Sequence, residues 1–196
     1  MRNLKKIGFA TALTLSLLAS SVSASAATHT VQSGDTFWNL GMKYGVSVLQ
    51  LKEVNNRTSD LIYPGEELEI PNSVTNEEKE LLARLVHAES KGEPYEGKVA
   101  VATVVLNRVD SSEFPDSIKE VIYEKTPGGS YAFSPVGNGQ INEPADEESK
   151  RAVDEAITFR GQGKGSLFFF NPDKSSNSYM MSREVTTVIG NHRFAK

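Results

Sequence analysis

An acidic residue, Glu89, continues the apolar side of a helix predicted at residues 75–90. Leu82, Leu85 and Val86 recur at helical spacing, and Glu89 follows them by seven, four and three residues. Glutamate is rarely buried without a partner. At the C-terminal end of a helix, burial and the helix dipole both disfavour the carboxylate, so both raise its pKa. Such a carboxyl group can donate a proton at neutral pH, as cleavage of a glycosidic bond requires.

Glu89 also has a purely structural interpretation, which is an ion pair with Arg84 or with another nearby arginine. Two further acids, Glu93 and Glu96, follow closely and could supply the second carboxylate of a water-using hydrolase. Glu93 could instead stabilise the start of the next helix through the helix dipole. The residues alone leave these interpretations open.

The composition argues against several classes of protein. The chain of 196 residues has 0 cysteines, which excludes disulfides, thiol catalysis and cysteine-ligated metals. Its histidines, His29, His87 and His192, lie far apart without an HExxH motif, and no GxSxG motif occurs. The formal net charge of −4 offers no electrostatic route to nucleic acid. We therefore expect no metal, no cofactor and no nucleic-acid partner.

Residues 1–27 have the pattern of a secretory signal peptide. Arg2, Lys5 and Lys6 precede an apolar run at residues 7–19, and small residues surround Ala26. Cleavage there would remove three cations and no acids, so the net charge would change from −4 to −7. The apolar run is short for a membrane span, and no later segment is long and apolar enough to cross a bilayer. We predict an exported protein without stable membrane insertion.

Residues 28–71 predict a compact strand–helix–helix–strand unit. Two short strands, at residues 29–32 and 67–70, flank two helices, which Thr36 and Ser47 are suited to cap. The stretches TVQSGDTFWNL, LKEVNN and IYPGEELEIP occur in this order, and together they resemble the LysM domain over its whole length. The resemblance implies binding of glycans that contain N-acetylglucosamine, such as peptidoglycan.

In the LysM family, the sugar lies against the first strand-to-helix loop and the loop before the last strand. The corresponding residues here are Ser33, Gly34, Asp35 and Thr36 in the first loop, and Leu61, Ile62 and Tyr63 in the second. Helix capping is an alternative role for Asp35 and Thr36, and the two roles are compatible. Trp38, the only tryptophan, belongs either to the core or to a sugar-binding platform.

A polar linker at residues 72–76 leads to a second predicted domain at residues 77–196. Thr75 and Glu78 form a capping-box pattern at its start. We expect four helices: one ending near Ser90, one starting at Pro94, one after Pro115 and one over Asp146–Arg160. The second is apolar nearly all round and should be central. A loop rich in glycine and proline, TPGGSYAFSPVGNGQIN, follows the third helix, and the tail predicts short strands and turns.

This second domain is similar to the spore cortex-lytic and related bacterial cell wall hydrolases. The stretches RLVHAESKGEPYEGKVAVATVVLNRV, FPDSIKEVIYE, YAFSPVGNG, LFFFNP and REVTTVIGNHRFA occur in the family's order over Leu81–Ala195. The resemblance implies a lysozyme-like fold of the lytic-transglycosylase type, with the acid of the AExxGEPYEG motif at Glu89. The expected fold class is α+β: a small βααβ LysM module, then a mainly helical domain with a small β appendage.

Eight other residues are candidates for binding substrate in this domain: Asn107, Phe133, Ser134, Phe168, Asn171, Tyr179, Arg183 and His192. Several of them have structural alternatives. Asn107 could cap the end of its helix, Phe133 could anchor its loop, and Arg183 and His192 could fix the tail. Tyr179 stands where relatives often carry tryptophan, so an aromatic surface for a sugar is expected there.

These features predict an exported enzyme that binds peptidoglycan and cleaves its bond between N-acetylmuramic acid and N-acetylglucosamine, located at the cell wall or the spore. Because Glu89 is the single well-placed acid, we expect a lytic transglycosylase, which needs only one. One alternative is a water-using muramidase or glucosaminidase with Glu93 or Glu96 as partner. Another is a wall-binding protein whose lysozyme-like domain has lost catalysis.

Overall fold

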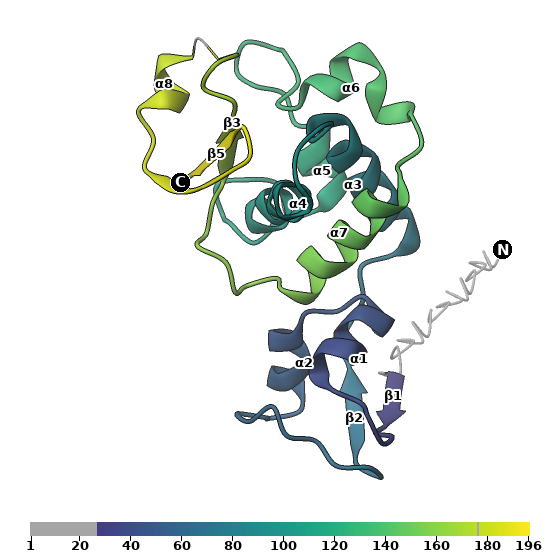
Figure 1. Ribbon diagram of the computed structural model, residues 1–196. Coiled ribbons are helices and arrows are strands. Elements are labelled where there is room, and N and C mark those ends of the chain that lie inside the picture. The colour runs from purple at the N-terminus through teal and green to yellow at the C-terminus, as the bar shows by residue number, and fades with distance from the viewer. Residues whose placement is uncertain (1–26, 176) are drawn as a thin grey trace, which may run out of the picture.

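The structure is a computed structural model that describes residues 27–175 and 177–196; the predicted signal peptide lies almost entirely outside this range. Two separate hydrophobic clusters form its cores. Figure 1 shows a small unit with a two-stranded sheet below a larger, mainly helical body. Within the described ranges, no helix combines the length and apolar character that a membrane crossing needs.

The small unit has the predicted strand–helix–helix–strand order. Its elements are β1 (Ala27–Thr30), α1 (Phe37–Tyr44), α2 (Val48–Val54) and β2 (Glu67–Ile70). The strands pair antiparallel, with His29 opposite Leu68. The core beneath them consists of Val31, Phe37, Leu40, Val46, Leu51, Leu68 and Ile70.

Local side-chain chemistry explains where the two small helices begin. The Thr36 hydroxyl accepts a hydrogen bond from the Asn39 amide, and the Ser47 hydroxyl accepts from the Leu49 amide. The first strand starts two residues earlier than predicted, at Ala27, and ends at Thr30. Val31 still donates its amide to the Glu66 carbonyl at 2.8 Å, so the pairing continues beyond the regular ladder.

The larger body is built around a central helix, α4 (Tyr95–Val109), as predicted. Five of its aliphatic residues, Val101, Ala102, Val104, Val105 and Leu106, are fully buried, and the other three are partly buried. The other helices surround it (Figure 1): α3 (Asn76–Glu89), α5 (Ile118–Ile122), α6 (Ser134–Asn138), the 3-10 turn η1 (Gln140–Asn142) and α7 (Glu147–Thr158). A capping box between Thr75 and Glu78 begins α3, as the sequence predicted.

The C-terminal appendage is a three-stranded antiparallel sheet in the order β3-β5-β4. A short helix lies between the first two of these strands in the chain. Its elements are β3 (Phe168–Phe170), α8 (Ser178–Met181), β4 (Val185–Ile189) and β5 (His192–Ala195). A bulge between Val185 and Thr187 interrupts the pairing of β4 with β5. Phe194, opposite Phe169 in the register, is fully buried in the main core and joins the sheet to the helices.

Two secondary-structure expectations were wrong. Residues 134–138, expected as part of a loop, form α6, with Pro135 in its first turn. Residues 178–181, expected as strand and turn, form α8, where the Asn177 side chain accepts from the Met180 amide. Single-turn helices are too short to produce a helical period in the sequence. The α+β class and the order of the predicted elements are confirmed.

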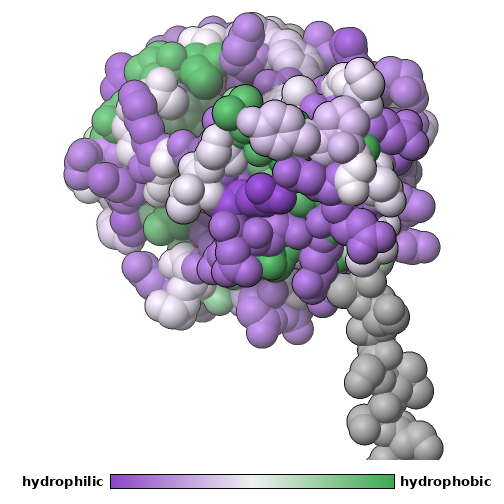
Figure 2. Space-filling view, turned by 90° about the horizontal axis from the view of Figure 1, so that it is seen from below, coloured by the Kyte–Doolittle hydropathy of each residue, from purple (hydrophilic) through white to green (hydrophobic). Residues whose placement is uncertain are grey.

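The small unit packs directly on α7 of the larger body. The Ser47 hydroxyl donates to the Arg160 carbonyl at 2.9 Å, and the rings of Trp38 and Phe159 meet edge to face at 4.7 Å. A Cβ atom on Gly41 of α1 would lie 2.8 Å from the Thr158 methyl group. These packing contacts, together with the linker, therefore orient the two units. Seen from the end of the small unit (Figure 2), the outer surface is mostly hydrophilic.

We expect Gly41→Ala to destabilise the protein, because its methyl group would overlap Thr158 and press on the Val46 carbonyl. The loss in unfolding free energy should be about 1–3 kcal/mol. Thr158→Ser, which removes the methyl group and keeps the hydroxyl, should restore part of it. Gly137→Ala in α6 is the matched control, because its nearest new contact is an ordinary 3.6 Å to Tyr131. Chemical denaturation of the wild type, Gly41→Ala, the double variant with Thr158→Ser, and Gly137→Ala measures these differences, and an undiminished Gly41→Ala stability would contradict close packing at the junction.

Candidate active site

Glu89 is the last residue of α3, and its side chain reaches the largest cavity described here. Leu82, Leu85 and Val86 on the same side of the helix are fully buried. The helix stops because Ser90 turns its hydroxyl back onto the Val86 carbonyl and Gly92 adopts a left-handed conformation, with φ of 82°. The apolar stripe therefore ends on a half-buried carboxyl group.

The cavity beside Glu89 has a volume of about 670 Å³. It lies between the end of α3, the end of α4, the segment around residues 124–134, β3 and α8. Five predicted site residues line it: Glu89, Phe133, Ser134, Phe168 and Tyr179. They come from four different elements, so the fold brings together residues that are up to 90 positions apart in the chain.

Burial raises the pKa of Glu89 to about 7. The carboxyl group makes no ion pair and no side-chain hydrogen bond with residues 27–175 or 177–196, so no cation there offsets the cost of burial. The alternative of an ion pair with Arg84 is absent from this range, and the Arg84 Nε atom is itself buried without a partner. A carboxyl group of this kind is substantially protonated near neutral pH.

Arg108 is a cation in the wall of the same cavity, and we did not predict it. It is 8% exposed, and its Nε atom donates to the Leu167 carbonyl at 2.8 Å. Its guanidinium group lies 4.9–5.4 Å from the ring centres of Phe114, Phe133 and Phe168. Burial lowers the pKa of Arg108, and the charge of Glu124 opposes this shift.

The sequence contained a signal for Arg108 that resembles the signal for Glu89. Arg108 follows Val101, Val104 and Val105 at helical spacing, so it also continues an apolar stripe. Most other cavity residues missing from the prediction carry no comparable pattern, because they lie in irregular segments: Phe114, Glu124, Lys125, Thr126, Pro127, Tyr131, Ala132 and Asn177. The remaining two, Phe169 in β3 and Met180 in α8, belong to elements too short to show a period.

Two predicted residues support the cavity wall from behind. Arg183 donates to the Tyr179 hydroxyl and stacks over the rings of Tyr179 and Phe168, at 4.6 and 4.0 Å from their centres. His192 is buried against Phe169, whose ring centre lies 5.4 Å away. Burial lowers the pKa of His192, although the charge of Glu93 opposes the shift. Neither residue is among those that line the cavity.

The structure places Asn107 and Asn171 away from Glu89. The Asn107 amide donates to the Ser166 carbonyl at 2.9 Å, and the residue lines a different cavity. The Asn171 side chain accepts from the Asp173 amide at 2.9 Å and so shapes a turn. Both positions have the local structural roles that polar residues near helix ends and turns commonly adopt.

The two predicted second carboxylates, Glu93 and Glu96, and the unpredicted acid Glu124 lie in three different environments. Burial raises the pKa of Glu93, but hydrogen bonds from the Asn191 amide and side chain outweigh it, so the pKa lies below its usual value. Glu93 thus connects the segment before α4 to the turn at Asn191 between β4 and β5. Glu96 lines the second cavity. Glu124 is the acid that shares the cavity with Glu89.

The two predicted glycan-binding loops of the small unit differ in their contacts, and the first is fixed by hydrogen bonds. Asp35 accepts from the Gln32 amide at 2.8 Å and pairs with His29 Nε2 at 2.7 Å. The bond to His29 lowers the pKa of Asp35 most, and the Gln32 amide adds to it. His29 Nδ1 lies 2.8 Å from the Tyr44 hydroxyl, which fixes the loop to α1. Thr36 caps α1, while Ser33 and Gly34 stay exposed beside it.

The second loop presents side chains to solvent. Leu61 is 65% exposed and Tyr63 is 60% exposed, whereas Ile62 packs against the core of the unit. Exposed apolar and aromatic side chains of this kind can cover the face of a sugar ring. Trp38 lies at the junction against Phe159, so it is not positioned in either loop.

Among the described residues, no group of three or more histidine, cysteine or acidic side chains is arranged to hold a metal ion. The Glu89 cavity instead contains the uncompensated Glu89 carboxyl group, a second acid in Glu124, the buried guanidinium group of Arg108 and several aromatic rings. This arrangement can supply a proton and cover a sugar, which suits acid catalysis on a glycan.

Comparison with known proteins is consistent with this chemistry. Residues 92–195 match the family described as Cell Wall Hydrolase, and residues 29–71 match the LysM domain. The chain is similar to spore cortex-lytic enzymes of Bacillus cereus (39% identity over 127 residues) and Bacillus subtilis (38% over 127 residues). These alignments cover 65% of this chain but only 47% and 40% of the two relatives, so less than half of each relative is matched.

A solved structure has the same fold in the second domain. The catalytic domain of the germination-specific lytic transglycosylase SleB from Bacillus anthracis aligns with a TM-score of 0.58 at 38% identity. The alignment covers 65% of this chain and 100% of that domain. The family match begins three residues after Glu89, so the argument for this residue rests on its geometry. The chain is a member of the cell wall hydrolase family, homologous to spore cortex-lytic enzymes, and carries a LysM domain before the family's catalytic domain.

Proposed function

We propose that this protein is an exported lytic transglycosylase that cleaves peptidoglycan between N-acetylmuramic acid and N-acetylglucosamine, with Glu89 as its catalytic acid. The observation that carries the proposal is the uncompensated Glu89 carboxyl group at the cavity wall, whose pKa burial raises to about 7. The domain organisation that goes with it is a LysM module at residues 28–71, a linker at 72–76 and a catalytic domain at 77–196. The predicted signal peptide would direct export of the chain, and the LysM module would target it to the wall.

In the first step, protonated Glu89 donates its proton to the glycosidic oxygen. The bond from that oxygen to C1 of N-acetylmuramic acid breaks, the leaving sugar departs as an alcohol, and positive charge develops at C1. In the second step, the Glu89 carboxylate takes the proton from the 6-hydroxyl of the same sugar. The 6-oxygen bonds to C1 and forms a 1,6-anhydro end, and Glu89 is protonated again. The cycle needs one protein acid and no water.

The environment of Glu89 suits both steps. A pKa near 7 lets one group donate and accept a proton at neutral pH with little cost in either direction. The aromatic side chains of Phe133, Phe168 and Tyr179 can pack against the sugar rings. We assign Arg183 and His192 to the support of this aromatic wall.

The names of the relatives support the proposed class of enzyme. The B. anthracis protein is described as a germination-specific lytic transglycosylase, and the curated relatives are named spore cortex-lytic enzymes. Enzymes of this class act at the wall or the cortex, outside the cytoplasm. The LysM match supports direct contact with peptidoglycan, through the two loops at residues 33–36 and 61–63.

A second candidate function is hydrolysis with a water nucleophile. Glu124 supports it, because a second carboxylate in the same cavity could activate a water molecule. Glu93 is less suited, since Asn191 holds both of its oxygens. The two routes give different products: lytic cleavage leaves anhydro ends, and hydrolysis leaves reducing ends.

Glu89→Gln should lower the rate of peptidoglycan cleavage by about 10²–10⁴-fold, because glutamine cannot donate the proton. Mass analysis of fragments released from purified peptidoglycan should show 1,6-anhydro ends with the wild type. Glu80→Gln, on the exposed side of the same helix, is the matched control and should keep full activity. Reducing ends that disappear in Glu124→Gln would establish the hydrolytic route instead. An active Glu89→Gln enzyme would remove Glu89 from catalysis.

The stability of Glu89→Gln relative to the wild type should depend on pH. The pKa of Glu89 is about 7 in the folded protein and 4.5 for an ordinary exposed glutamate, so folding takes up a proton between these pH values. The wild type therefore loses stability as the pH rises from about 4.5 to 7, and the glutamine variant does not. The advantage of the variant should reach at most about 3 kcal/mol above pH 7, less where solvent reaches the carboxyl group.

Urea denaturation of the wild type and the variant between pH 4.5 and 8 measures this difference, with Glu80→Gln as control. The control should track the wild type at every pH, because Glu80 is exposed. If Glu89 formed an ion pair, the glutamine variant would instead be the less stable protein at neutral pH.

The combined Leu61→Ala and Tyr63→Ala substitutions should weaken co-sedimentation with insoluble peptidoglycan, because both side chains are exposed in a predicted glycan-binding loop. Cleavage of short soluble glycans should stay nearly unchanged, since this loop belongs to the other domain. Val54→Ala, at an exposed position of the LysM module outside both loops, is the control. Unaltered co-sedimentation of the double variant would argue against this loop as the binding surface.

A further inference from the structure

Arg108, at the wall of the Glu89 cavity, carries hydrogen-bond donors that the protein itself does not use. The residue is 8% exposed, and its Nε atom donates to the Leu167 carbonyl at 2.8 Å. A guanidinium group has five N–H donors, and the four on the terminal nitrogens form no hydrogen bond with residues 27–175 or 177–196. Buried donors without a partner destabilise a fold, so these donors indicate a partner that a ligand supplies.

The guanidinium group lies at the surface of the cavity and is held there by aromatic rings. Its central carbon is 4.9, 5.1 and 5.4 Å from the ring centres of Phe114, Phe133 and Phe168. All three rings line the cavity together with Arg108 and Glu89. Because a guanidinium group is planar and stacks on aromatic faces, the rings restrict its orientation. Arg108 is therefore a preorganised donor beside the space that Glu89 reaches.

The other charged groups of the cavity leave these donors available. Glu124 forms no ion pair with Arg108, although its charge opposes the lowering of the Arg108 pKa by burial. Lys125 is another cation of the cavity, but it is exposed and lies 5.1 Å from the ring centre of Tyr131. Water competes for the donors of Lys125, whereas the low dielectric around Arg108 strengthens a hydrogen bond made there.

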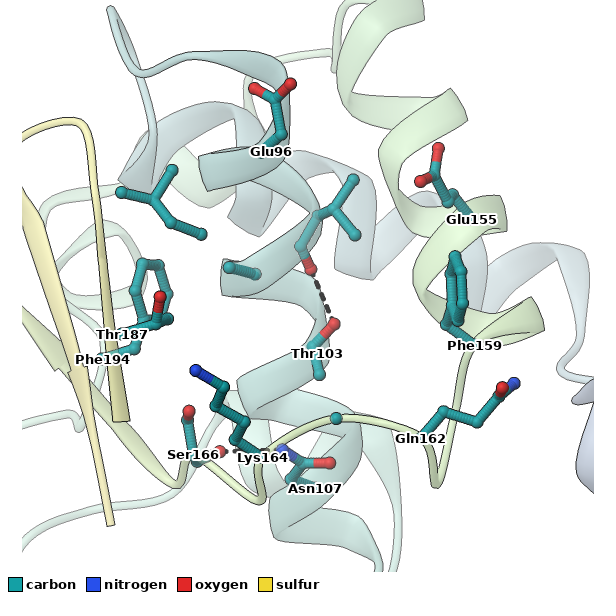
Figure 3. Close-up of a pocket in the computed structure, with 14 residues that line it drawn as sticks. Glu96, Thr103, Asn107, Glu155, Phe159, Gln162, Lys164, Ser166, Thr187 and Phe194 are labelled. Carbon is teal, nitrogen blue, oxygen red and sulfur yellow. Dashed lines mark hydrogen bonds between the residues drawn. The ribbon is translucent and has the colours of Figure 1, made fainter. Parts of the chain in front are cut away.

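The second cavity, of about 300 Å³, differs because the protein itself uses polar groups in its wall. Thr103 and Asn107 donate to main-chain carbonyls, both at 2.9 Å (Figure 3). Glu155 accepts a hydrogen bond from the Tyr95 hydroxyl at 2.7 Å, and Lys164 is exposed to water. The unused donors in the Glu89 cavity are therefore the stronger indication of a ligand.

A glycan strand of peptidoglycan offers one group that distinguishes its two sugars. N-acetylmuramic acid and N-acetylglucosamine alternate, so the strand contains two kinds of glycosidic bond, and the proposed function cleaves one of them. N-acetylmuramic acid differs by a lactyl ether on its 3-oxygen, which ends in a carbonyl group. The carbonyl belongs to an amide where a peptide is attached and to a carboxylate where none is. Both forms present an acceptor oxygen that a guanidinium group can bind.

We propose that Arg108 determines which of the two bonds is cleaved, by donating hydrogen bonds from its terminal nitrogens to the lactyl carbonyl of an N-acetylmuramic acid unit. Because the sugars alternate, holding one such unit at Arg108 fixes the register of the strand and thus the bond that meets Glu89. The proposal rests on the proposed function, since that function places a glycan strand in this cavity. The cavity volume of about 670 Å³ lies within the usual range of ligand pockets, about 300–1,000 Å³.

The contact is tested by titrating the chain that lacks its predicted signal peptide and carries Glu89→Gln, followed by nuclear magnetic resonance. The probes are a tetramer of N-acetylglucosamine, the alternating tetramer with free lactyl carboxylates, and the alternating tetramer with lactyl methylamides. Amide signals of Ser134 and Phe168 report on the Glu89 cavity separately from the LysM module. Both muramic acid probes should bind about 10- to 100-fold more tightly than the N-acetylglucosamine tetramer, as expected for a hydrogen bond to a charged group.

Substitutions of Arg108 in the same background separate its contact with the sugar from its packing. Arg108→Met keeps an unbranched side chain among the rings but cannot donate, so both muramic acid probes should bind only as tightly as the N-acetylglucosamine tetramer. The affinity for that tetramer should not change. Arg108→Lys keeps the charge without the planar fork and should retain part of the preference. Arg151→Met, at an exposed position of α7 outside the cavity, is the matched control and should keep all of it.

The cleavage products give a second readout, with Glu89 intact. The wild type should release fragments that end in 1,6-anhydro-N-acetylmuramic acid. Arg108→Met should also release fragments that end in 1,6-anhydro-N-acetylglucosamine, because the register of the strand is no longer fixed. Mass analysis of the released fragments measures the ratio of the two ends, which a role of Arg108 in packing alone would leave unchanged.

Equal binding of the three probes to the Glu89→Gln parent would overturn the proposal, and this comparison does not depend on whether Arg108→Met folds. Tight binding of the carboxylate probe alone would also overturn it, since the proposed contact is to the oxygen that both lactyl forms share. So would an active Arg108→Met enzyme that leaves only muramic acid ends. The proposed function fails on a different result, which is that the wild type releases no fragments from peptidoglycan.

Discussion

The chemistry proposed for this protein depends on the cost of burying one carboxyl group without a counter-charge. Glu89 sits where the apolar stripe of α3 meets a cavity, and burial holds its pKa near 7. A cation within hydrogen-bonding distance would stabilise the carboxylate and return the pKa to the acidic range. The fold instead uses its nearby buried cation, Arg108, to bind the Leu167 carbonyl and to stack among three aromatic rings. The positive charge thus shapes the cavity without pairing with Glu89.

The central helix α4 borders both cavities of the catalytic domain, each with a different face. At its C-terminal end, Arg108 and the packed aromatic rings form the wall of the Glu89 cavity. Along another side, Val99, Ala100 and Thr103 line the second cavity, of about 300 Å³. Because the helix is buried over most of its length, both faces are held rigidly by the same core. A substitution in that core would therefore change the packing around both cavities.

The contact between the domains adds a second constraint. Gly41 leaves no room for a methyl group against Thr158, and Ser47 and Trp38 make specific contacts with the end of α7. A module joined only by its linker would search the wall independently of the catalytic domain. Here the orientation of the predicted glycan-binding loops is fixed relative to the catalytic domain, so under the proposed function the place where the module binds would restrict which bond Glu89 can reach.

The sequence by itself determined the local features. Caps at Thr36, Ser47 and Thr75 and the periodicity of α3 and α4 identified the main helices, and the apolar stripe identified Glu89, because these signals depend on residues within a turn or two of each other. Only the tertiary structure decided which distant residues surround the acid. Asn107 faces the other side of α4, Glu93 is held by Asn191, and Glu124 enters the cavity from an irregular segment. Burial and the resulting pKa come from contacts across the whole chain, and those contacts leave no periodic pattern in the sequence.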